Sequence, residues 1–243
     1  MPSEFRLFAA MDATWPAAEM RQLGPWTLRR GLGGGKRVSA ATTKAEDVEG
    51  AAINDGESAM RRWGQEPVFM LRAGNAPLDD RLDALGYRLV DPVLLFAGNL
   101  ARIAAVQVEP LDAIPSVEPL AIMRELWKRN GIGISRVAVM ARARGPKTHL
   151  FSRHRDAPAG CAFVAVDGDV AMLHALAVDP PFRRDGVARR LMARAATWAG
   201  DHGARIMAVA TTGDNLPAQS LFRGLGMEAI ANYHYRLKRK AWN

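Results

Sequence analysis

The sequence is poor in cysteine: Cys161 is the single one among 243 residues. One cysteine excludes an internal disulfide framework and a metal site built from several cysteines. Cys161 stands in the apolar run CAFVAV, so we expect a core residue and not a nucleophile. Long hydrophobic runs are also lacking, because stretches such as residues 92–97 are far shorter than the roughly 20 residues of a membrane span.

The N-terminal segment lacks the apolar core of a secretory signal. Glu4, Arg6 and Asp12 interrupt it. A hydrophobic content of 49% with 24% charged residues is typical of globular proteins. We therefore expect a cytoplasmic protein with no membrane partner.

Acidic residues are scarce in the second part of the chain. Residues 1–100 carry 12 Lys and Arg against 13 Asp and Glu, whereas residues 101–243 carry 21 against 12. A net charge of +9 on the second part suits an anionic partner, such as nucleic acid, a membrane surface or a polyanionic cofactor. A basic surface without any partner is the alternative that charge alone leaves open.

The first hundred residues predict alternating helices and strands. We expect a helix over residues 5–23 and short strands at 26–30 and 36–43, separated by GLGGGK. A phosphate-binding loop of the form G-x-x-x-x-G-K-[ST] would need glycine in place of Arg30 and serine or threonine in place of Arg37. The glycine run is therefore interpreted as a turn.

Prolines in residues 99–116 indicate a connection, which places a domain boundary near residue 100 and predicts domains at 1–100 and 101–243. The two parts share one spacing. Asn75 precedes Gly86 by eleven residues, and Asn215 precedes Gly226 by eleven residues. Each segment follows an apolar strand and predicts a helix and then a strand, which suggests a common ancestor for the two halves.

The second half predicts a mixed α/β sheet, with its strongest signal in residues 172–194. An apolar strand ending at Val178 leads through a basic loop to Gly186, where a helix begins. Backbone N–H groups at a helix start attract an anion, and glycine allows it to approach the main chain closely. With Arg183 and Arg184 beside it, this loop predicts a phosphate or pyrophosphate site.

Arg183 to Ala188 match the pattern R/Q-x-x-G-x-G/A, and TTGDNLPAQSLFRGLGM follows downstream of them. Together these motifs resemble the general amine N-acetyltransferase (GNAT) superfamily over roughly residues 104–238. The resemblance implies a mostly antiparallel GNAT-type sheet flanked by helices. The first half is similar to a degenerate copy, so the whole resembles two GNAT-like domains in tandem.

The resemblance implies an N-acetyltransferase with acetyl-CoA as cosubstrate and an amine of a small molecule or protein as acceptor. Backbone groups of the strand would pair with the pantetheine arm, and N–H groups of the loop would hold the pyrophosphate. The implied cofactor residues are Leu176, Ala177, Val178, Arg183, Arg184, Asp185, Gly186, Val187, Ala188, Asn215 and Phe222. Asn215 also suits an N-cap, since Pro217 stands in the first turn of the helix that follows.

His174 is the candidate general base, because an imidazole has a suitable pKa and the residue precedes the thioester-facing strand by two positions. A satisfied histidine on a buried strand is the alternative. The family motif A-x-x-L-Y supplies an acid, but Phe222 stands in the tyrosine position. Solvent, or Tyr233 or Tyr235 in the last strand, could protonate the thiolate instead. The chain could also bind coenzyme A without turnover.

Two functions of other classes stay open: a non-catalytic acetyl-CoA-binding module, and a nucleic-acid-binding protein suggested by the basic charge and RLKRK at 236–240. No basic platform interleaved with aromatic residues supports the second. We expect a monomer or homodimer without a metal site. Specificity in such folds depends on the region around residues 127–146, whose composition does not identify the acceptor.

Overall fold

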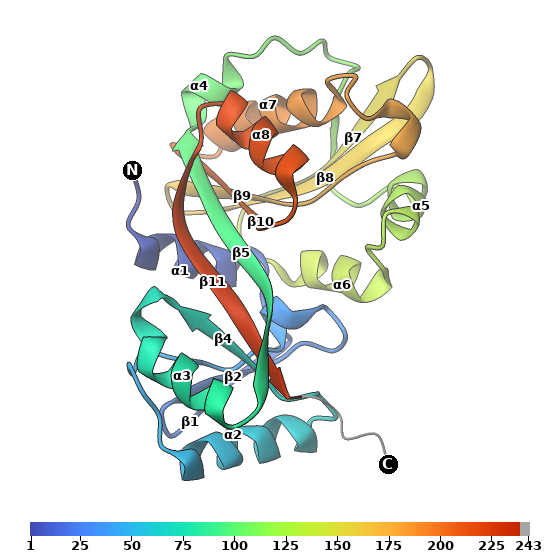
Figure 1. Cartoon of the computed structure of the whole chain (residues 1–243). Helices are drawn as coiled ribbons and strands as arrows, with labels where there is room; N and C mark the ends of the chain where they lie inside the picture. The colour runs from blue at the N-terminus through green and yellow to red at the C-terminus, as the bar shows by residue number, and fades with distance from the viewer. Residues whose placement is uncertain (239–243) are drawn as a thin grey trace. The chain divides into compact units, whose positions relative to one another are not determined.

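The computed structural model describes residues 1–238 and shows two compact units, each of which combines segments from separate parts of the sequence. Unit 1 consists of Met1–Pro16 and Leu95–Ile230. Unit 2 consists of Ala17–Leu94 and residues 231–238. The N-terminal segment therefore belongs with the second half of the chain, and the C-terminal strand ends in the unit of the first half (Figure 1).

Unit 1 is built on a mixed sheet with the strand order β5-β10-β9-β8-β7-β6 (Figure 1). The strands are β5 (Tyr87–Asn99), β6 (Ile114–Ser116), β7 (Lys147–His154), β8 (Ala157–Asp167), β9 (Val170–Val178) and β10 (Ile206–Thr212). From β6 to β9 all neighbours are antiparallel, and β9 pairs with β10 in parallel. The predicted mixed α/β sheet is confirmed.

Helices cover both faces of this sheet, so β8 and β9 are buried almost throughout and read as continuous apolar runs. Helix α7 packs on β7, β8 and β9, while α1 and α5 pack on β8 and β9 from the other side (Figure 1). The helices are α1 (Glu4–Thr14), α4 (Leu100–Ala104), α5 (Ala121–Arg129), α6 (Ile134–Arg142), α7 (Val187–Gly200) and α8 (Leu216–Gly224). Cys161 of β8 is fully buried, as predicted.

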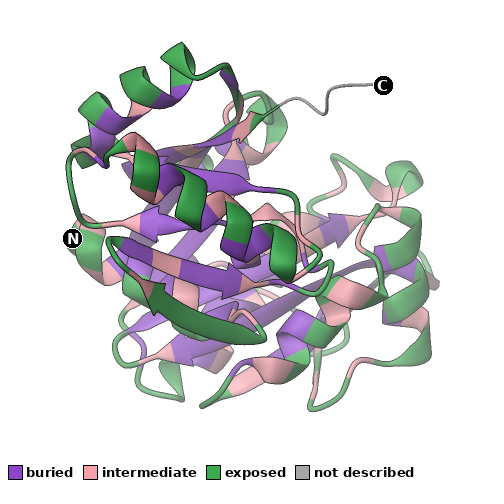
Figure 2. Ribbon diagram, turned by 90° about the horizontal axis from the view of Figure 1, so that it is seen from below, coloured by how far each residue is buried: buried purple, intermediate pink, exposed green. Residues whose placement is uncertain are grey.

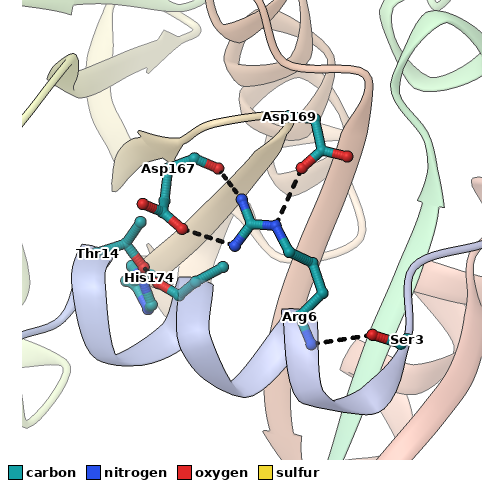
Figure 3. A network of polar contacts seen from close by, with 7 residues as sticks. Ser3, Arg6, Thr14, Asp167, Asp169 and His174 are labelled. Atoms are coloured by element: carbon teal, nitrogen blue, oxygen red, sulfur yellow. Dashed lines mark hydrogen bonds and ion pairs between the residues drawn. The ribbon is translucent and has the colours of Figure 1, made fainter.

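Ser3 caps α1, and Arg6 holds the helix against the β8–β9 hairpin (Figure 3). Ser3 caps the helix by accepting a 3.2 Å hydrogen bond from the Arg6 backbone. The Arg6 guanidinium lies 2.6 Å from the Asp167 carboxylate and 3.1 Å from that of Asp169, and it also donates to the Asp167 carbonyl. One arginine thus binds both aspartates of the VDGD hairpin turn.

The predicted helix over residues 5–23 is wrong in its second half. α1 ends at Thr14, and Glu19–Leu23 form strand β1 of unit 2. The physical reason is Pro16, because the residue before a proline is disfavoured in the helical region. Trp15 accordingly leaves the helix at φ −136°.

Unit 2 contains a three-stranded sheet in the order β1-β2-β3, and in it β4, β11 and the start of β5 are neighbouring strands in the order β4-β11-β5. Its elements are β1, β2 (Trp26–Arg30), β3 (Thr42–Thr43), β4 (Val68–Arg72) and β11 (Glu228–Lys238), with helices α2 (Gly50–Arg62) and α3 (Ala76–Ala84). Its core gathers around Trp26, Phe69 and Tyr87. Figure 2 shows how buried residues follow the strands of the chain.

The glycine run GLGGGK forms a turn, as predicted, and it opens a 3₁₀ helix (Lys36–Val38) where a strand was expected. Gly33 and Gly35 adopt φ values of 78° and 99°. A Cβ on Gly31 would clash with Ser39 Oγ, so the glycine allows two chain segments to cross closely. The run has a structural role in unit 2.

The C-terminal strand is tied into unit 2 by Arg236, which is 7% exposed. Its guanidinium lies 2.6 Å from the Asp79 carboxylate, donates to Asp83 and bonds the Tyr87 carbonyl at 2.9 Å. The contacts divide the chain near residue 95, close to the predicted boundary at 100, but both terminal segments cross it. The division into domains 1–100 and 101–243 remains a prediction.

The spacing shared by the two halves corresponds to matching structure. Asn75 precedes α3 and Asn215 precedes α8, and Gly86 and Gly226 follow these helices at φ 81° and 77°. Each helix lies between a strand and a long strand, in the orders β4-α3-β5 and β10-α8-β11. A strand, a helix, a glycine with positive φ and a second strand thus follow one another in the same order in both segments.

Candidate active site

Strands β9 and β10 are paired over only part of their length. The parallel register runs from Val170 with Ile206 to Leu173 with Val209. Strand β9 continues to Val178 and β10 to Thr212 beyond this paired segment. The backbone of residues 174–178 therefore has an edge that can take an additional extended chain, as in β-strand addition.

A β-bulge lies in β9 where this pairing ends. Phe163 of β8 faces His174 and Cys161 faces Ala177, so one β8 residue stands opposite two β9 residues, 175 and 176. Ala175 adopts φ 51°, which is rare for a residue with a Cβ. The bulge changes the direction of the strand next to the free backbone edge.

The loop between β9 and α7 has two residues in the left-handed backbone region. Arg184 and Gly186 both adopt left-handed conformations, at φ 70° and 77°. Gly186 is the N-cap of α7, and no side chain caps the helix there. The uncapped first turn and the positive end of the helix dipole suit an anion.

The strand edge and the loop open on one cleft with a volume of about 810 Å³. Nine of the eleven predicted cofactor residues line it: Leu176, Ala177, Val178, Arg183, Arg184, Gly186, Val187, Ala188 and Asn215. A cleft lined by an apolar strand edge and by arginines suits a ligand that is extended and carries an anionic group.

Asp185 does not line the cleft. Its carboxylate lies 3.3 Å from His154 Nε2 and 3.3 Å from an Arg155 nitrogen, both at the end of the β7–β8 hairpin. Arg190 donates to the Asp185 carbonyl at 3.0 Å. Asp185 therefore stabilises the loop from outside the cleft, although it lies within the sequence motif.

Phe222 does not line the cleft either. It is 4% exposed and packs on Phe96, with ring centroids 5.6 Å apart. The cleft face of α8 is instead formed by Pro217, Ala218, Ser220, Leu221 and Gly224. The position that carries tyrosine in the sequence motif therefore points into the core of unit 1 here.

Asn215 has both of the positions expected of it. Its side-chain oxygen accepts a 3.2 Å hydrogen bond from the Ala218 backbone, so it caps α8. It also lines the cleft. The capping bond uses one side-chain oxygen, and the amide nitrogen on the same group is a donor with a separate direction.

His174 is buried between α1 and the sheet, with 5% exposure (Figure 3). Its Nε2 lies 2.9 Å from Thr14 Oγ1, and that hydroxyl donates to the Ala10 carbonyl at 2.7 Å. The hydroxyl has one hydrogen, so Nε2 must carry a proton and donate to Thr14. The ring stacks on Phe163 and packs against Trp15, at centroid distances of 6.2 Å and 4.9 Å.

Tyr233 and Tyr235 lie in unit 2, where they pair with Arg72 and Met70 of β4. Both are buried, and their rings meet edge to face at 5.5 Å. Burial, together with the neighbouring Tyr233, raises the pKa of Tyr235 well above its ordinary value. Neither tyrosine is among the residues that line the cleft.

The sequence did not predict several residues that line the cleft, namely Asn130, Ile132, Phe182, Arg189, Pro217, Ala218, Ser220, Leu221 and Gly224. Helical spacing could have found some of them. Arg189 lies in the first turn of α7, and residues 217, 220, 221 and 224 share one face of α8. Asn130 and Ile132 carry no such signal, because they lie in the irregular segment between α5 and α6.

Comparison with known proteins identifies the segment that contains this cleft. Residues 120–227 match the model of the acetyltransferase (GNAT) family. These residues are a GNAT acetyltransferase domain. The match includes the bulged strand, the arginine loop and α8.

Similar chains extend over nearly the whole length of the protein. The uncharacterized N-acetyltransferase YobR of Bacillus subtilis (strain 168) is 25% identical over 236 residues, covering 93% of this chain and 95% of that one. A GCN5-related N-acetyltransferase from Kribbella flavida superposes with a TM-score of 0.68 at 19% identity, over 97% and 95% of the two chains. A tandem GNAT protein from the clavulanic acid biosynthesis pathway gives 0.63 at 13%, over 95% and 86%.

Residues 120–227 therefore form an acetyl-CoA-dependent acyltransferase domain of the GNAT type, with acetyl-CoA as cosubstrate, and the predicted GNAT fold is confirmed. The family assignment favours an N-acetyltransferase over a binding module or a nucleic-acid-binding protein. Of the basic segment 236–240, the last two residues lie outside the described part of the chain. Within residues 1–238, no helix is long and apolar enough to cross a membrane.

Proposed function

We propose that this GNAT enzyme transfers the acetyl group of acetyl-CoA to a primary amine of a small molecule or protein by direct attack. The amine nitrogen forms a bond to the thioester carbonyl carbon, and the carbon–sulfur bond breaks. The amine loses a proton, and the coenzyme A thiolate gains one. The observation that carries this proposal is that the free edge of β9 and the uncapped start of α7 open on the same cleft.

The residues around the cleft fit the parts of acetyl-CoA. Backbone N–H groups from Arg184 to Ala188 would hold the pyrophosphate, with Arg183 adding positive charge. The edge of residues 176–178 would pair with the amide-containing pantetheine arm. Asn215 would contribute its amide nitrogen while its oxygen caps α8.

For the proton of the amine, we propose His174 as general base, acting through water. Its position on β9, two residues before Leu176, supports this assignment. Because Nε2 donates to Thr14, Nδ1 would be the nitrogen that accepts the proton. Replacing His174 with glutamine should lower kcat most at neutral pH. The loss should diminish at high pH, where the amine deprotonates without help. A stability loss with an unchanged pH–rate profile would instead indicate a purely structural histidine.

For the thiolate, we propose protonation by solvent. Phe222 has no proton to give and is buried against Phe96. Tyr233 and Tyr235 are buried in unit 2, and a tyrosine with a raised pKa, such as Tyr235, releases its proton less readily. The first half is proposed to be a degenerate GNAT copy, on the basis of the recurring strand, helix and glycine.

The test of the cofactor site is Gly186→Glu. A carboxylate at the start of α7 would occupy the place proposed for the pyrophosphate, so we expect affinity for coenzyme A to fall by at least about 100-fold. Gly203→Glu is the matched control, because Gly203 also has a positive φ, 87°, and a Cβ there meets no atom within 4 Å. Retained coenzyme A binding in Gly186→Glu would overturn the site assignment.

A further inference from the structure

Trp127 makes one directional contact with the bulged strand. Its indole Nε1 donates a 2.8 Å hydrogen bond to the carbonyl of Ala175. Trp127 lies on α5 and is fully buried, so the packing around its ring fixes the position of the indole N–H. The bond joins a helix on one face of the sheet to the most distorted point of β9.

Ala175 has an unfavourable backbone conformation that requires support. At φ 51° its Cβ is crowded by the backbone, and the local sequence HALAV contains no glycine that would relieve this. Such conformations persist where surrounding contacts determine them. The Trp127 bond is a contact of this kind, because it fixes the direction of the Ala175 carbonyl.

The direction of that carbonyl also determines the direction of a donor. The peptide group that joins Ala175 and Leu176 is planar and trans, so its C=O and N–H point in opposite directions. With the carbonyl held toward α5, the Leu176 N–H points away from α5. Leu176 is the first β9 residue that lines the cleft.

We propose that Trp127 is a positioning residue, which holds the Ala175–Leu176 peptide so that the Leu176 N–H faces the thioester carbonyl oxygen. This inference rests on the proposed acetyl transfer. Charge develops on that oxygen as the amine attacks, and a donor fixed in advance stabilises it without reorganisation. Trp127 acts through the backbone of the bulge and contacts no substrate.

The experiment replaces Trp127 with phenylalanine, which keeps an aromatic ring but removes the N–H. We expect kcat to fall by about 10- to 100-fold, less than or similar to the loss of a whole oxyanion donor. The KM for acetyl-CoA and the affinity for coenzyme A should change by less than about threefold, because the loop at 183–188 is untouched. A kcat within about twofold of the parent value would overturn the proposal.

Trp26→Phe is a matched control. Trp26 is also buried, and its Nε1 also donates a 2.8 Å bond to a backbone carbonyl, that of Ala52 in unit 2. It should lower thermal stability to a similar extent and leave kcat unchanged. Equal loss of kcat in the two variants would show that the effect is general destabilisation, and the proposal would be wrong.

A second substitution tests the strain argument. Glycine adopts positive φ at no steric cost, so Ala175→Gly should restore part of the kcat lost in Trp127→Phe. No recovery in the double variant would contradict the assigned role of the bulge. The amide resonance of Leu176 in ¹⁵N-leucine-labelled protein gives a readout independent of turnover: it should shift in Trp127→Phe and not in Trp26→Phe. If the parent releases no coenzyme A with any amine, the proposed function fails, while this shift still tests the positioning.

Discussion

His154 Nε2 lies 3.3 Å from the carboxylate of Asp185, and its Nδ1 lies 3.2 Å from an Arg190 guanidinium nitrogen. A neutral imidazole with its proton on Nε2 satisfies both neighbours, since it donates to the aspartate and accepts from the arginine. The end of β7 is thereby connected to the loop and to the first turns of α7. This histidine supports the proposed pyrophosphate site from outside the cleft.

Removal of this support should weaken cofactor binding. His154→Leu loses both hydrogen bonds, so we expect the dissociation constant for coenzyme A to rise about three- to tenfold, with little change in kcat. Asp185→Asn keeps an acceptor for His154 and removes a negative charge, so binding should be unchanged or tighter. Isothermal titration of both variants checks this. Weaker binding in Asp185→Asn alone would mean that the carboxylate acts on the cofactor directly.

Asn215 should show two separable effects. Asn215→Ala removes the cap of α8 and should cost about 1 kcal/mol of unfolding free energy, and it should also weaken coenzyme A binding. Asn215→Ser keeps a capping oxygen but has no amide donor. We therefore expect serine to restore stability in urea titrations without restoring affinity. Recovery of both quantities in the serine variant would reduce Asn215 to a capping residue.

Substitution of the tyrosines in β11 tests which group protonates the coenzyme A thiolate. Tyr233→Phe and Tyr235→Phe should each leave kcat within about threefold of the parent, because both are buried in unit 2 and neither lines the cleft. Steady-state kinetics across the alkaline range checks this. A fall of about 100-fold with loss of the alkaline limb would instead assign that tyrosine as the acid.

Stability should depend on pH through His149, which is 3% exposed on β7 and donates through Nδ1 to the Val117 carbonyl. Burial lowers the pKa of His149 below its ordinary value of 6.5. The unfolded chain therefore takes up a proton below about pH 6.5 while the folded protein resists it, so stability falls as pH falls. The slope is at most about 1.4 kcal/mol per pH unit for one group.

Urea unfolding between about pH 5 and pH 7 measures this dependence. His149→Gln keeps a donor for the Val117 carbonyl and does not titrate, so its stability should vary less over the same range. The other histidines are present in both proteins, and the difference isolates His149. Identical slopes would show that His149 does not hold the lowered pKa.

The parts of the site that depend on residues close in sequence could be predicted from the sequence. The loop at 183–188 follows a strand and opens a helix, and the local pattern determines both its glycine and its place. Asn215 and Pro217 likewise signal the start of α8. Of the missed elements, α4 carries a local signal, because Asn99 caps it by accepting from the Arg102 backbone at 3.2 Å. Strand β6 is three residues long and exists through its pairing with β7.

The orientation of single side chains depends on partners distant in sequence and could not be predicted. Asp185 turns outward because His154 and Arg155 meet it, and Phe222 turns inward because Phe96 packs on it. The bulge at Ala175 gives no sequence signal, since alanine is an ordinary strand residue. Its cause lies in the pairing of β8 and in Trp127 of α5.

The exchange of terminal segments has a consequence for the gene. A cut at codon 100 would place Thr14 and Asp79 in one product and their partners His174 and Arg236 in the other. The first product would thus lack β11 of unit 2, and the second would lack α1 of unit 1. Insertions and deletions that respect the reading frame in the middle of the gene should therefore be better tolerated than truncations at either end. Each unit is complete only when both halves of the gene are inherited together.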